Sequence, residues 1–305
     1  MPELFLTIFF ISILLIFLGT GIWVALSMVG VSAIGMFLFT SRPVGDAMAT
    51  TIWGTSSSWT LTALPLFVWM GEILFRTKLS ENLFKGLAPW LSRLPGGLIH
   101  VNVVGCALFA AISGSSAATV ATVGKMSIPE LRKRNYPEKL LLGSLAGSGT
   151  LGLLIPPSII LIIYGVTVQE SIAKLFIAGI IPGIMLAIFF MLYVIGWSVL
   201  NKKIMPKMDE TFSFFQKIKQ SGQLIPVIVL ILSVIGSIYV GIATATEAAS
   251  LGVVGALILS FFQKSLNKET FKLSLLGATK TSCMIAFILA GSSFLSLAMG
   301  FTGLP

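Results

Sequence analysis

Long apolar runs alternate with short polar segments along the whole chain. The apolar runs cover residues 4–40, 50–75, 97–128, 141–166, 173–200, 222–242, 244–263 and 282–303. Most of them reach the roughly 20 apolar residues that an α-helix needs to cross a bilayer. A helix also satisfies its own backbone hydrogen bonds in lipid, where water is absent. The pattern therefore predicts an all-α polytopic membrane protein.

Two segments depart from one helix per span. The run 4–40 is too long for one ordinary span and contains Gly-Thr-Gly at 19–21. We expect either two helices with a break there or one tilted helix followed by an interfacial segment. Residues 78–96 place Leu87 and Trp90 among apolar residues at helical spacing, with basic residues between them. This spacing predicts an amphipathic arm in the cytoplasmic interface; a plain surface connection is the alternative.

Composition and charge support the membrane interpretation. Of the 305 residues, 56% are hydrophobic and 10% are charged, whereas soluble domains carry about 25% charged residues. The net charge of +9 comes from Lys and Arg between the apolar runs. The basic segments are 76–93 (with Lys78), 132–139, 202–219 (with Lys207) and 264–280. The positive-inside rule places such segments in the cytoplasm, so the basic character predicts contact with a lipid bilayer and no nucleic-acid partner.

The run 97–128 cannot be a single crossing if both of its basic flanks are cytoplasmic. At 32 residues it is also longer than one span requires. The simplest solution is a re-entrant hairpin that enters the membrane, turns, and leaves on the same side. Gly114, Ser115 and Ser116 supply the turn, because glycine tolerates the backbone angles of tight turns.

Such a hairpin tip is a candidate ion site. Non-helical backbone at membrane depth is tolerated where it is buried in protein or lines a cavity, and transporters use these breaks to bind ions and substrates. Neutral hydroxyl and carbonyl oxygens can hold a hard cation. We therefore predict Na⁺ ligands at Gly114, Ser115, Ser116 and Thr119. Close helix packing is the alternative role for these small residues.

A second break is predicted within 143–165, where a glycine-rich stretch precedes two adjacent prolines. Proline removes a backbone donor and disfavours helical geometry in the residue before it. An unwound segment facing the hairpin tip would add ion ligands at Gly147, Ser148, Gly149 and Thr150. A substrate site would then comprise Ser115, Ser116, Pro156, Pro157 and Ser158. An ordinary proline kink is the alternative.

An internal repeat is suggested by two Gly/Ser-led stretches that end in Leu-Pro. They are "WGTSSSWTLTALP" at 53–65 and "AGSSFLSLAMGFTGLP" at 290–305. Inverted repeats are common in secondary transporters, so we expect a second repeat to begin near residue 222. The chain stops at "FTGLP" beside an apolar run, which leads us to expect an incomplete second repeat.

Several stretches resemble the large membrane subunit of the TRAP (tripartite ATP-independent periplasmic) transporters of bacteria and archaea. They are "LPGGLIHVNVVGCALFAAISGSSAATVATVGKMSIPELRKRNYP", "AGSGTLGLLIPPSIILIIYG", "AKLFIAGIIPGI" and "ATATEAASLGVVGALI". The resemblance covers nearly the whole chain, but the family's C-terminal part, with a second hairpin, is absent. Many members carry an Asp soon after the Gly-Ser tip, where this chain has residues 118–120, Ala-Thr-Val.

The resemblance implies an elevator-type secondary transporter, and together with the inverted repeat suggested by the residue pattern it divides the chain into five segments. These are scaffold helices and a first bundle helix (1–77), the arm (78–96), a transport domain of hairpin and broken helix (97–166), a scaffold helix with a basic loop (167–221), and the incomplete second repeat (222–305). It further implies a small membrane subunit, a periplasmic substrate-binding protein, and a place in the bacterial inner membrane. Sodium would drive import of an organic acid, such as a C4-dicarboxylate or a sialic acid, without any other cofactor.

Other functions are less compatible with the residues. A channel or passive membrane scaffold would need no coupling ion. An intramembrane hydrolase could pair Ser115 with His100, but the chain has neither a Gly-x-Ser-x-Gly nor a His-Glu-x-x-His motif. An ATP-driven pump would need a phosphate-binding loop, and "TVGKM" lacks the Ser or Thr that must follow its lysine. We therefore expect a transporter and not an enzyme.

Overall fold

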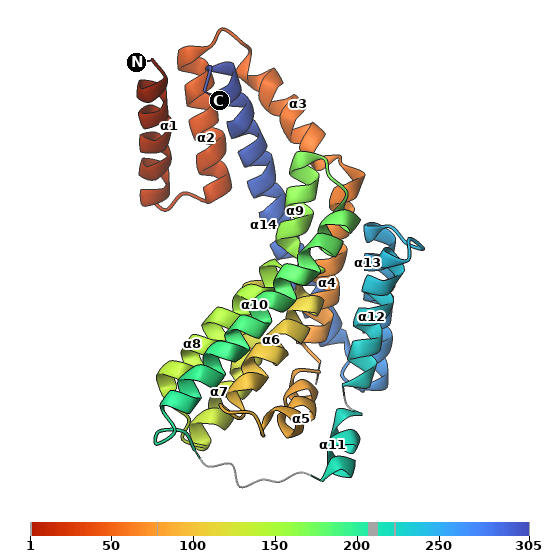
Figure 1. Cartoon of the computed structure of the whole chain (residues 1–305). Coiled ribbons are helices and arrows are strands. Elements are labelled where there is room, and N and C mark those ends of the chain that lie inside the picture. The colour runs from red at the N-terminus through yellow and green to blue at the C-terminus, as the bar shows by residue number, and fades with distance from the viewer. Residues whose placement is uncertain (1, 78, 207–212, 223, 305) are drawn as a thin grey trace. The chain divides into compact units, whose positions relative to one another are not determined.

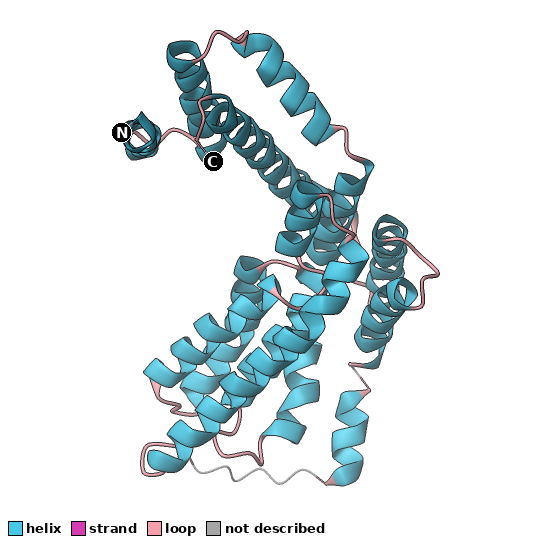
Figure 2. Cartoon of the chain, turned by 45° about the horizontal axis from the view of Figure 1, so that its top comes forward, coloured by secondary structure: helices cyan, strands magenta, loops and turns pink. Residues whose placement is uncertain are grey.

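The computed structural model describes residues 2–77, 79–206, 213–222 and 224–304. In these ranges Figure 2 shows helices joined by loops and turns, and no strand is assigned there. The prediction of an all-α chain is therefore confirmed. Two of the predicted basic residues, Lys78 and Lys207, lie outside the described residues.

Most helices follow the predicted apolar runs, and Figure 1 labels the α-helices. The start of α14 was predicted wrongly, because this helix begins at Lys268, inside the basic segment 264–280 that was expected to connect two runs. They are α1 (Pro2–Gly19), α2 (Val24–Phe39), α3 (Val44–Ser56), η1 (Trp59–Thr62), α4 (Ala63–Phe75), α5 (Leu79–Leu91), α6 (Ile99–Ser113), α7 (Ser116–Lys133), α8 (Glu138–Gly149), η2 (Thr150–Leu153), α9 (Ile159–Val168), α10 (Ile172–Leu200), α11 (Phe214–Ser221), α12 (Ile225–Tyr239), α13 (Ala245–Phe262) and α14 (Lys268–Phe301).

Three helices, α10, α13 and α14, are long and apolar enough to cross a membrane by themselves. The number rises to five if each of two bent pairs counts as one span, namely α3 with η1 and α4, and α11 with α12. These counts refer to the described part of the chain. Several membrane-capable helices in one chain make this a multi-pass membrane protein.

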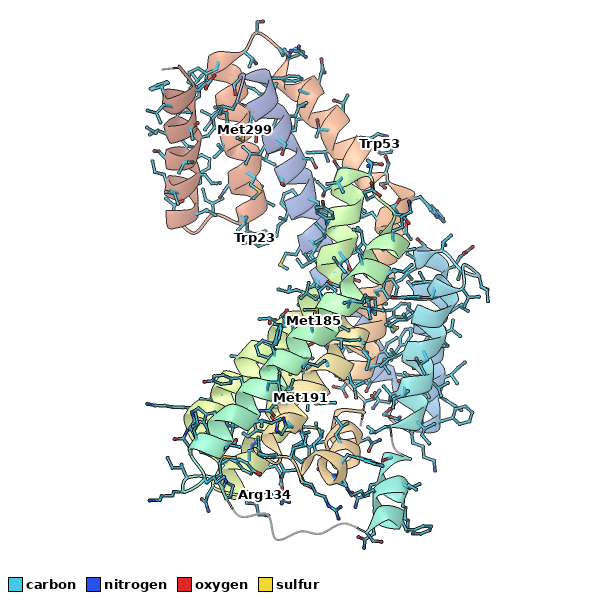
Figure 3. The ribbon with its side chains drawn as sticks, viewed as in Figure 1. Trp23, Trp53, Arg134, Met185, Met191 and Met299 are labelled. Carbon is cyan, nitrogen blue, oxygen red and sulfur yellow. The ribbon has the colours of Figure 1, made fainter. Side chains whose placement is uncertain are left out.

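The chain divides into two compact units. The first comprises residues 1–61 and 280–305. In this unit the run 4–40 forms two separate helices, α1 and α2, which pack together. Of the two alternatives for this run, the structure therefore shows two helices with a break. Gly21 permits the turn between them with a φ of +80°. Trp23 and Trp53, labelled in Figure 3, are about three-quarters exposed, as is typical of aromatic residues at membrane interfaces.

The second unit comprises residues 62–279 and contains both predicted breaks. Helices α6, α7 and α8 pack against one another, and α10 packs against α6 and α8. A buried cluster of Val103, Ala110 and Leu151 forms part of their core. Helix α4 contacts both α6 and α13, so it links the hairpin to the last part of this unit.

The predicted arm is a helix, α5, and it packs against α11 and α6. The indole nitrogen of Trp90 donates to Ser221 Oγ at 2.6 Å. The ammonium of Lys217 lies 5.3 Å from the centroid of the Trp90 ring, within the range of a cation–π interaction. A Cβ atom on Gly86 would collide with Leu224. The arm is therefore helical, and it is joined to the segment that leads into α12. Its place in the cytoplasmic interface stays a prediction.

The repeat and the segment boundaries stay predictions. The stretch 53–65 contains a break between α3 and η1, whereas residues 290–301 are continuous helix within α14. The local structures of the two stretches therefore differ. The division into compact units also cuts through the predicted segments 1–77 and 222–305.

Candidate functional site

The run 97–128 folds as a helical hairpin. Helices α6 and α7 pack against each other and are separated by Gly114 and Ser115. Gly114 ends α6 in the left-handed conformation, with a φ of +59°, a region that costs other L-residues roughly 1–2 kcal/mol. The run is thus not one unbroken helix, and the turn lies at the predicted residues.

Hydroxyl groups hold the tip of this hairpin. Ser115 is the N-cap of α7, and its Oγ accepts from the backbone N–H of Ala118 at 3.4 Å. The Ser113 and Thr119 hydroxyls lie 3.0 Å apart. Ser113 Oγ also contacts the carbonyl of Ser115, at 3.3 Å, and its N–H, at 3.4 Å. The tip is therefore fixed by short polar side chains that remain neutral.

The second predicted break is also present. Helix α8 ends at Gly149, a 3₁₀ turn follows to Leu153, and α9 begins at Ile159. The peptide bond between Pro156 and Pro157 is cis. Ser158 is fully buried, and its hydroxyl donates to the carbonyl of Leu153 at 2.8 Å. The segment 150–158 is therefore an ordered interruption of a helical path.

The two interruptions lie against each other. The backbone N–H of Ile159 donates to the carbonyl of Gly114 at 3.2 Å. A Cβ atom on Gly114 would lie 2.6 Å from the carbonyl oxygen of Pro157, and one on Gly152 would lie 3.0 Å from the backbone nitrogen of Ser116. Backbone thus packs on backbone at both places, which requires glycine. The second break therefore faces the hairpin tip.

The structure brings only some of the predicted ligands to this contact. Gly149 faces α7, because its Cβ would collide with Val120. Gly147 instead faces Phe190 of α10. The hydroxyl of Ser148 is buried between α8 and α6 and donates to the carbonyl of Ser144 at 2.6 Å.

Two further positions complete this picture. Thr150 is exposed, and its hydroxyl donates back to the carbonyl of Gly147 at 2.7 Å. Gly152 was not among the predicted ligands, yet it lies directly at the tip. Its three-residue spacing from Gly149 places the two glycines on one helical face, which is the signal that could have identified it.

Unpaired hydrogen-bonding groups gather at the tip. Ser116 Oγ is buried and has no partner among the described residues. The first N–H groups of α7 (Ser116 and Ala117) and of α9 (Ile160 and Leu161) have no recorded acceptor within the described chain. Helix N-termini with free N–H groups attract anions. The two N-termini are held together by the bond between Ile159 and Gly114.

The tip has neutral donors and acceptors in place of charges. Across the described residues, no three His, Cys, Asp or Glu side chains gather as a metal-binding cluster. A cation at the tip would thus be held by hydroxyl and carbonyl oxygens, the ligand set that alkali and alkaline-earth ions accept. The carbonyls of Ile112 and Ser113 end α6 and have no recorded hydrogen-bond donor among the described residues, and the C-terminal end of a helix favours cations.

The other end of the hairpin carries the charges. Arg134, labelled in Figure 3, ends α7 and pairs with Glu130 at 2.9 Å. Arg132 pairs with Glu138 at the start of α8, and this hydrogen bond lowers the pKa of the Glu138 carboxyl. Tyr136 OH accepts from the backbone N–H of Leu98 at 3.0 Å and so ties this loop to the beginning of α6. Tip and base therefore differ sharply in polarity.

Comparison with known proteins identifies the family. Residues 9–305 match the family described as the DctM component of the tripartite ATP-independent periplasmic transporters. The chain belongs to this family. The DctM family consists of transporter permeases and not of enzymes.

Three relatives illustrate the family. One is the C4-dicarboxylate TRAP transporter large permease protein DctM of Pseudomonas aeruginosa, 33% identical over 261 residues, which cover 85% of this chain and 60% of that protein. The protein of the same name from Rhodobacter capsulatus is 31% identical over 316 residues, with 98% and 70% covered. The isethionate TRAP transporter permease protein DctMQ of Oleidesulfovibrio alaskensis is 32% identical over 282 residues, with 90% and 43% covered. The chain thus spans between about two-fifths and seven-tenths of these DctM relatives.

Proposed function

We propose that this chain is the membrane permease subunit of a Na⁺-coupled secondary transporter that imports a small organic acid. A periplasmic binding protein delivers the substrate, and a small membrane subunit completes the transporter in the bacterial inner membrane. The hairpin α6–α7 enters the membrane from the cytoplasmic side and returns to it. Hairpin and broken helix move together against a scaffold, in an elevator mechanism.

The observation that carries this proposal is the contact between the two breaks. A tight backbone packing of Gly114 and Gly152 onto the opposite segment orders both breaks together. Sodium held by Ser115, Ser116 and Thr119, with the last carbonyls of α6, would favour this ordered state. Only an ion that binds the ordered state better than the open one can couple to transport.

The substrate site follows from the same geometry. Free N–H groups at the starts of α7 and α9 suit a carboxylate or sulfonate, and the cation at the C-terminal end of α6 would sit beside it. The names of the relatives fit this class, because C4-dicarboxylates and isethionate are small organic anions. Pro156, Pro157 and Ser158 shape the wall of the site next to the N-terminus of α9.

Partners and orientation are supported less directly. The tripartite family description implies two further components. The basic loop after α7 would face the cytoplasm under the positive-inside rule. That orientation places the tip of the hairpin inside the membrane, because α7 rises about 1.5 Å per residue over its 18 residues.

Uptake by the reconstituted transporter tests the function. Full-length protein is incorporated into liposomes with its small subunit and binding protein, and uptake of radiolabelled succinate is followed with an inward gradient of Na⁺ or of K⁺. We expect uptake only with Na⁺. Uptake that is equal in the two salts would overturn sodium coupling and would favour a channel or passive scaffold.

Variants then test the site. Ser115→Ala and Ser116→Ala should raise the Na⁺ concentration for half-maximal uptake more than they lower the amount of folded protein. Ser260→Ala is the matched control, since Ser260 is fully buried and its hydroxyl donates to the carbonyl of Ala256 within α13, at 2.7 Å. If the tip variants behave like the control, the tip does not bind the ion.

A further inference from the structure

Ser113 is the last residue of α6, and its hydroxyl forms hydrogen bonds to the turn and to α7. Its side chain is nearly buried, with 6% of the residue exposed. Its hydroxyl lies 3.0 Å from Thr119 Oγ1 and 3.3 Å from the carbonyl oxygen of Ser115, and it accepts from the Ser115 N–H at 3.4 Å. One hydroxyl thus joins the end of α6, the turn and the first turn of α7.

The direction of these hydrogen bonds can be worked out by satisfying every proton. Within the described chain, the Thr119 hydroxyl has Ser113 as its recorded partner, so its proton points to Ser113 Oγ. The Ser113 proton then points to the Ser115 carbonyl. Since Ser113 also accepts from the Ser115 N–H, its one donor and two acceptor sites are all used. With this assignment, neither lone pair of Thr119 Oγ1 has a recorded donor among the described residues.

Helix α4 fixes the backbone of Ser113 from the other side. A Cβ atom on Gly71 would lie 2.9 Å from Ser113 Cα and 3.4 Å from the carbonyl oxygens of Ile112 and Ser113. Backbone cannot move aside as the end of a flexible side chain can, so even a methyl group at Gly71 would displace the end of α6. The position of Ser113 is therefore set by α4 as well as by the hairpin.

We propose that Ser113 is a positioning residue that sets the ion affinity of the tip. Its hydroxyl is not itself a ligand, because its hydrogen-bonding capacity is used by Ser115 and Thr119. It holds the Thr119 hydroxyl so that the free lone pairs of that oxygen can face the ion, and α4 controls this arrangement through Gly71. Without the Ser113 hydroxyl, the Thr119 proton turns to the carbonyl four residues earlier, a common bond for threonine in helices, and the lone pairs rotate away.

This inference rests on the proposed ion site, so the experiment reports on both separately. Ala117 is exposed in the first turn of α7. In a Cys283→Ser background, which removes the exposed native thiol while Cys106 stays buried, Ala117→Cys is labelled with a maleimide in proteoliposomes. Na⁺ should slow the labelling as it orders the tip, and K⁺ should not. The Na⁺ concentration for half-maximal protection is the quantity compared.

Ser113→Ala should raise that concentration roughly three- to tenfold, the effect expected from losing one hydrogen bond. Ser113→Thr keeps the hydroxyl and should stay within about twofold of the wild type. Ser144→Ala is the control, because Ser144 is equally buried but bonds to Asn102 and Leu141, away from the tip. Gly71→Ala should raise the concentration like Ser113→Ala.

The possible failures are distinguishable. If Na⁺ gives the wild type no specific protection, the proposed ion site itself is wrong. If the wild type is protected but Ser113→Ala matches Ser144→Ala, or if Ser113→Thr matches Ser113→Ala, the positioning role is wrong and the ion site stands. If Ser113→Ala does not fold, Gly71→Ala decides, because it displaces Ser113 while keeping the hydroxyl. If the Na⁺ concentration for half-maximal protection is then the same in Gly71→Ala as in the wild type, the positioning role of Ser113 is wrong.

Discussion

Gly114→Ala is the sharpest perturbation of the contact between hairpin tip and broken helix. The residue is at a φ of +59°, and its α-carbon faces the carbonyl oxygen of Pro157 and the backbone N–H of Ile159. Its own carbonyl accepts from that N–H at 3.2 Å. A methyl group at this position therefore acts on conformation, on packing and on a hydrogen bond at once.

The expected loss of stability can be worked out from these parts. Left-handed backbone costs an alanine roughly 1–2 kcal/mol. The new Cβ would lie 2.6 Å from the carbonyl oxygen of Pro157, so one backbone segment must move away. If the movement breaks the bond between Ile159 and Gly114, a buried donor left unpaired costs about 1–3 kcal/mol more. The sum is roughly 2–5 kcal/mol.

Gly241→Ala separates these contributions. Gly241 has a φ of +74° and lies in the same compact unit, and a Cβ atom there would have no neighbour within 4 Å, so only the conformational cost applies. Thermal unfolding of both variants in detergent, followed by tryptophan fluorescence, gives the comparison. We expect Gly114→Ala to lower the unfolding temperature at least twice as much as Gly241→Ala. Equal shifts would refute the close backbone contact.

Three other predictions follow from the same unit. Gly152→Ala places a Cβ 3.0 Å from the first backbone nitrogen of α7, so it should weaken Na⁺ protection of the tip, as maleimide labelling would show. Tyr136→Phe leaves the N–H of Leu98 without its acceptor and should cost about 1–3 kcal/mol in thermal unfolding; an unchanged midpoint contradicts this. Because Arg132 lowers the pKa of Glu138, the stability from this pair is present above the ordinary carboxyl pKa of about 4 and is lost as pH falls through the lower folded pKa. Glu138→Gln should abolish that acid-side loss in pH-dependent unfolding.

Much of the architecture could be predicted because it depends on the lengths of the apolar runs and on the Gly and Pro residues that interrupt helices. Gly-Thr-Gly at 19–21 and the Gly-Ser turn at 114–116 mark two breaks, and both are present. The two basic flanks indicated a turn somewhere within 97–128, and the Gly-Ser residues indicated its position. The adjacent prolines likewise indicated that α8 would not continue into α9. These signals are local, and tertiary packing does not override them.

The directions of side chains could not be predicted in the same way. Ser148 and Gly149 are neighbours in sequence, but a helix turns about 100° per residue, so they point to different partners. Ser148 bonds within the α6–α8 interface, whereas Gly149 faces the tip. Selecting every small or polar residue near the break therefore mixed two helix faces. The contact between the Ser113 and Thr119 hydroxyls could not be predicted either, because it depends on how α6 and α7 pack.

Val120 fills the space next to Gly149, and this limits which substitutions the two positions can accept. A methyl group on Gly149 overlaps a methyl group of Val120, so neither residue can grow unless the other shrinks. Val120→Ala would open a void that an alanine at 149 could fill. Each substitution alone should therefore be harmful, and the pair should be tolerated. The sizes of the residues at positions 120 and 149 are therefore expected to change together, so the sequences of the hairpin and the broken helix depend on each other.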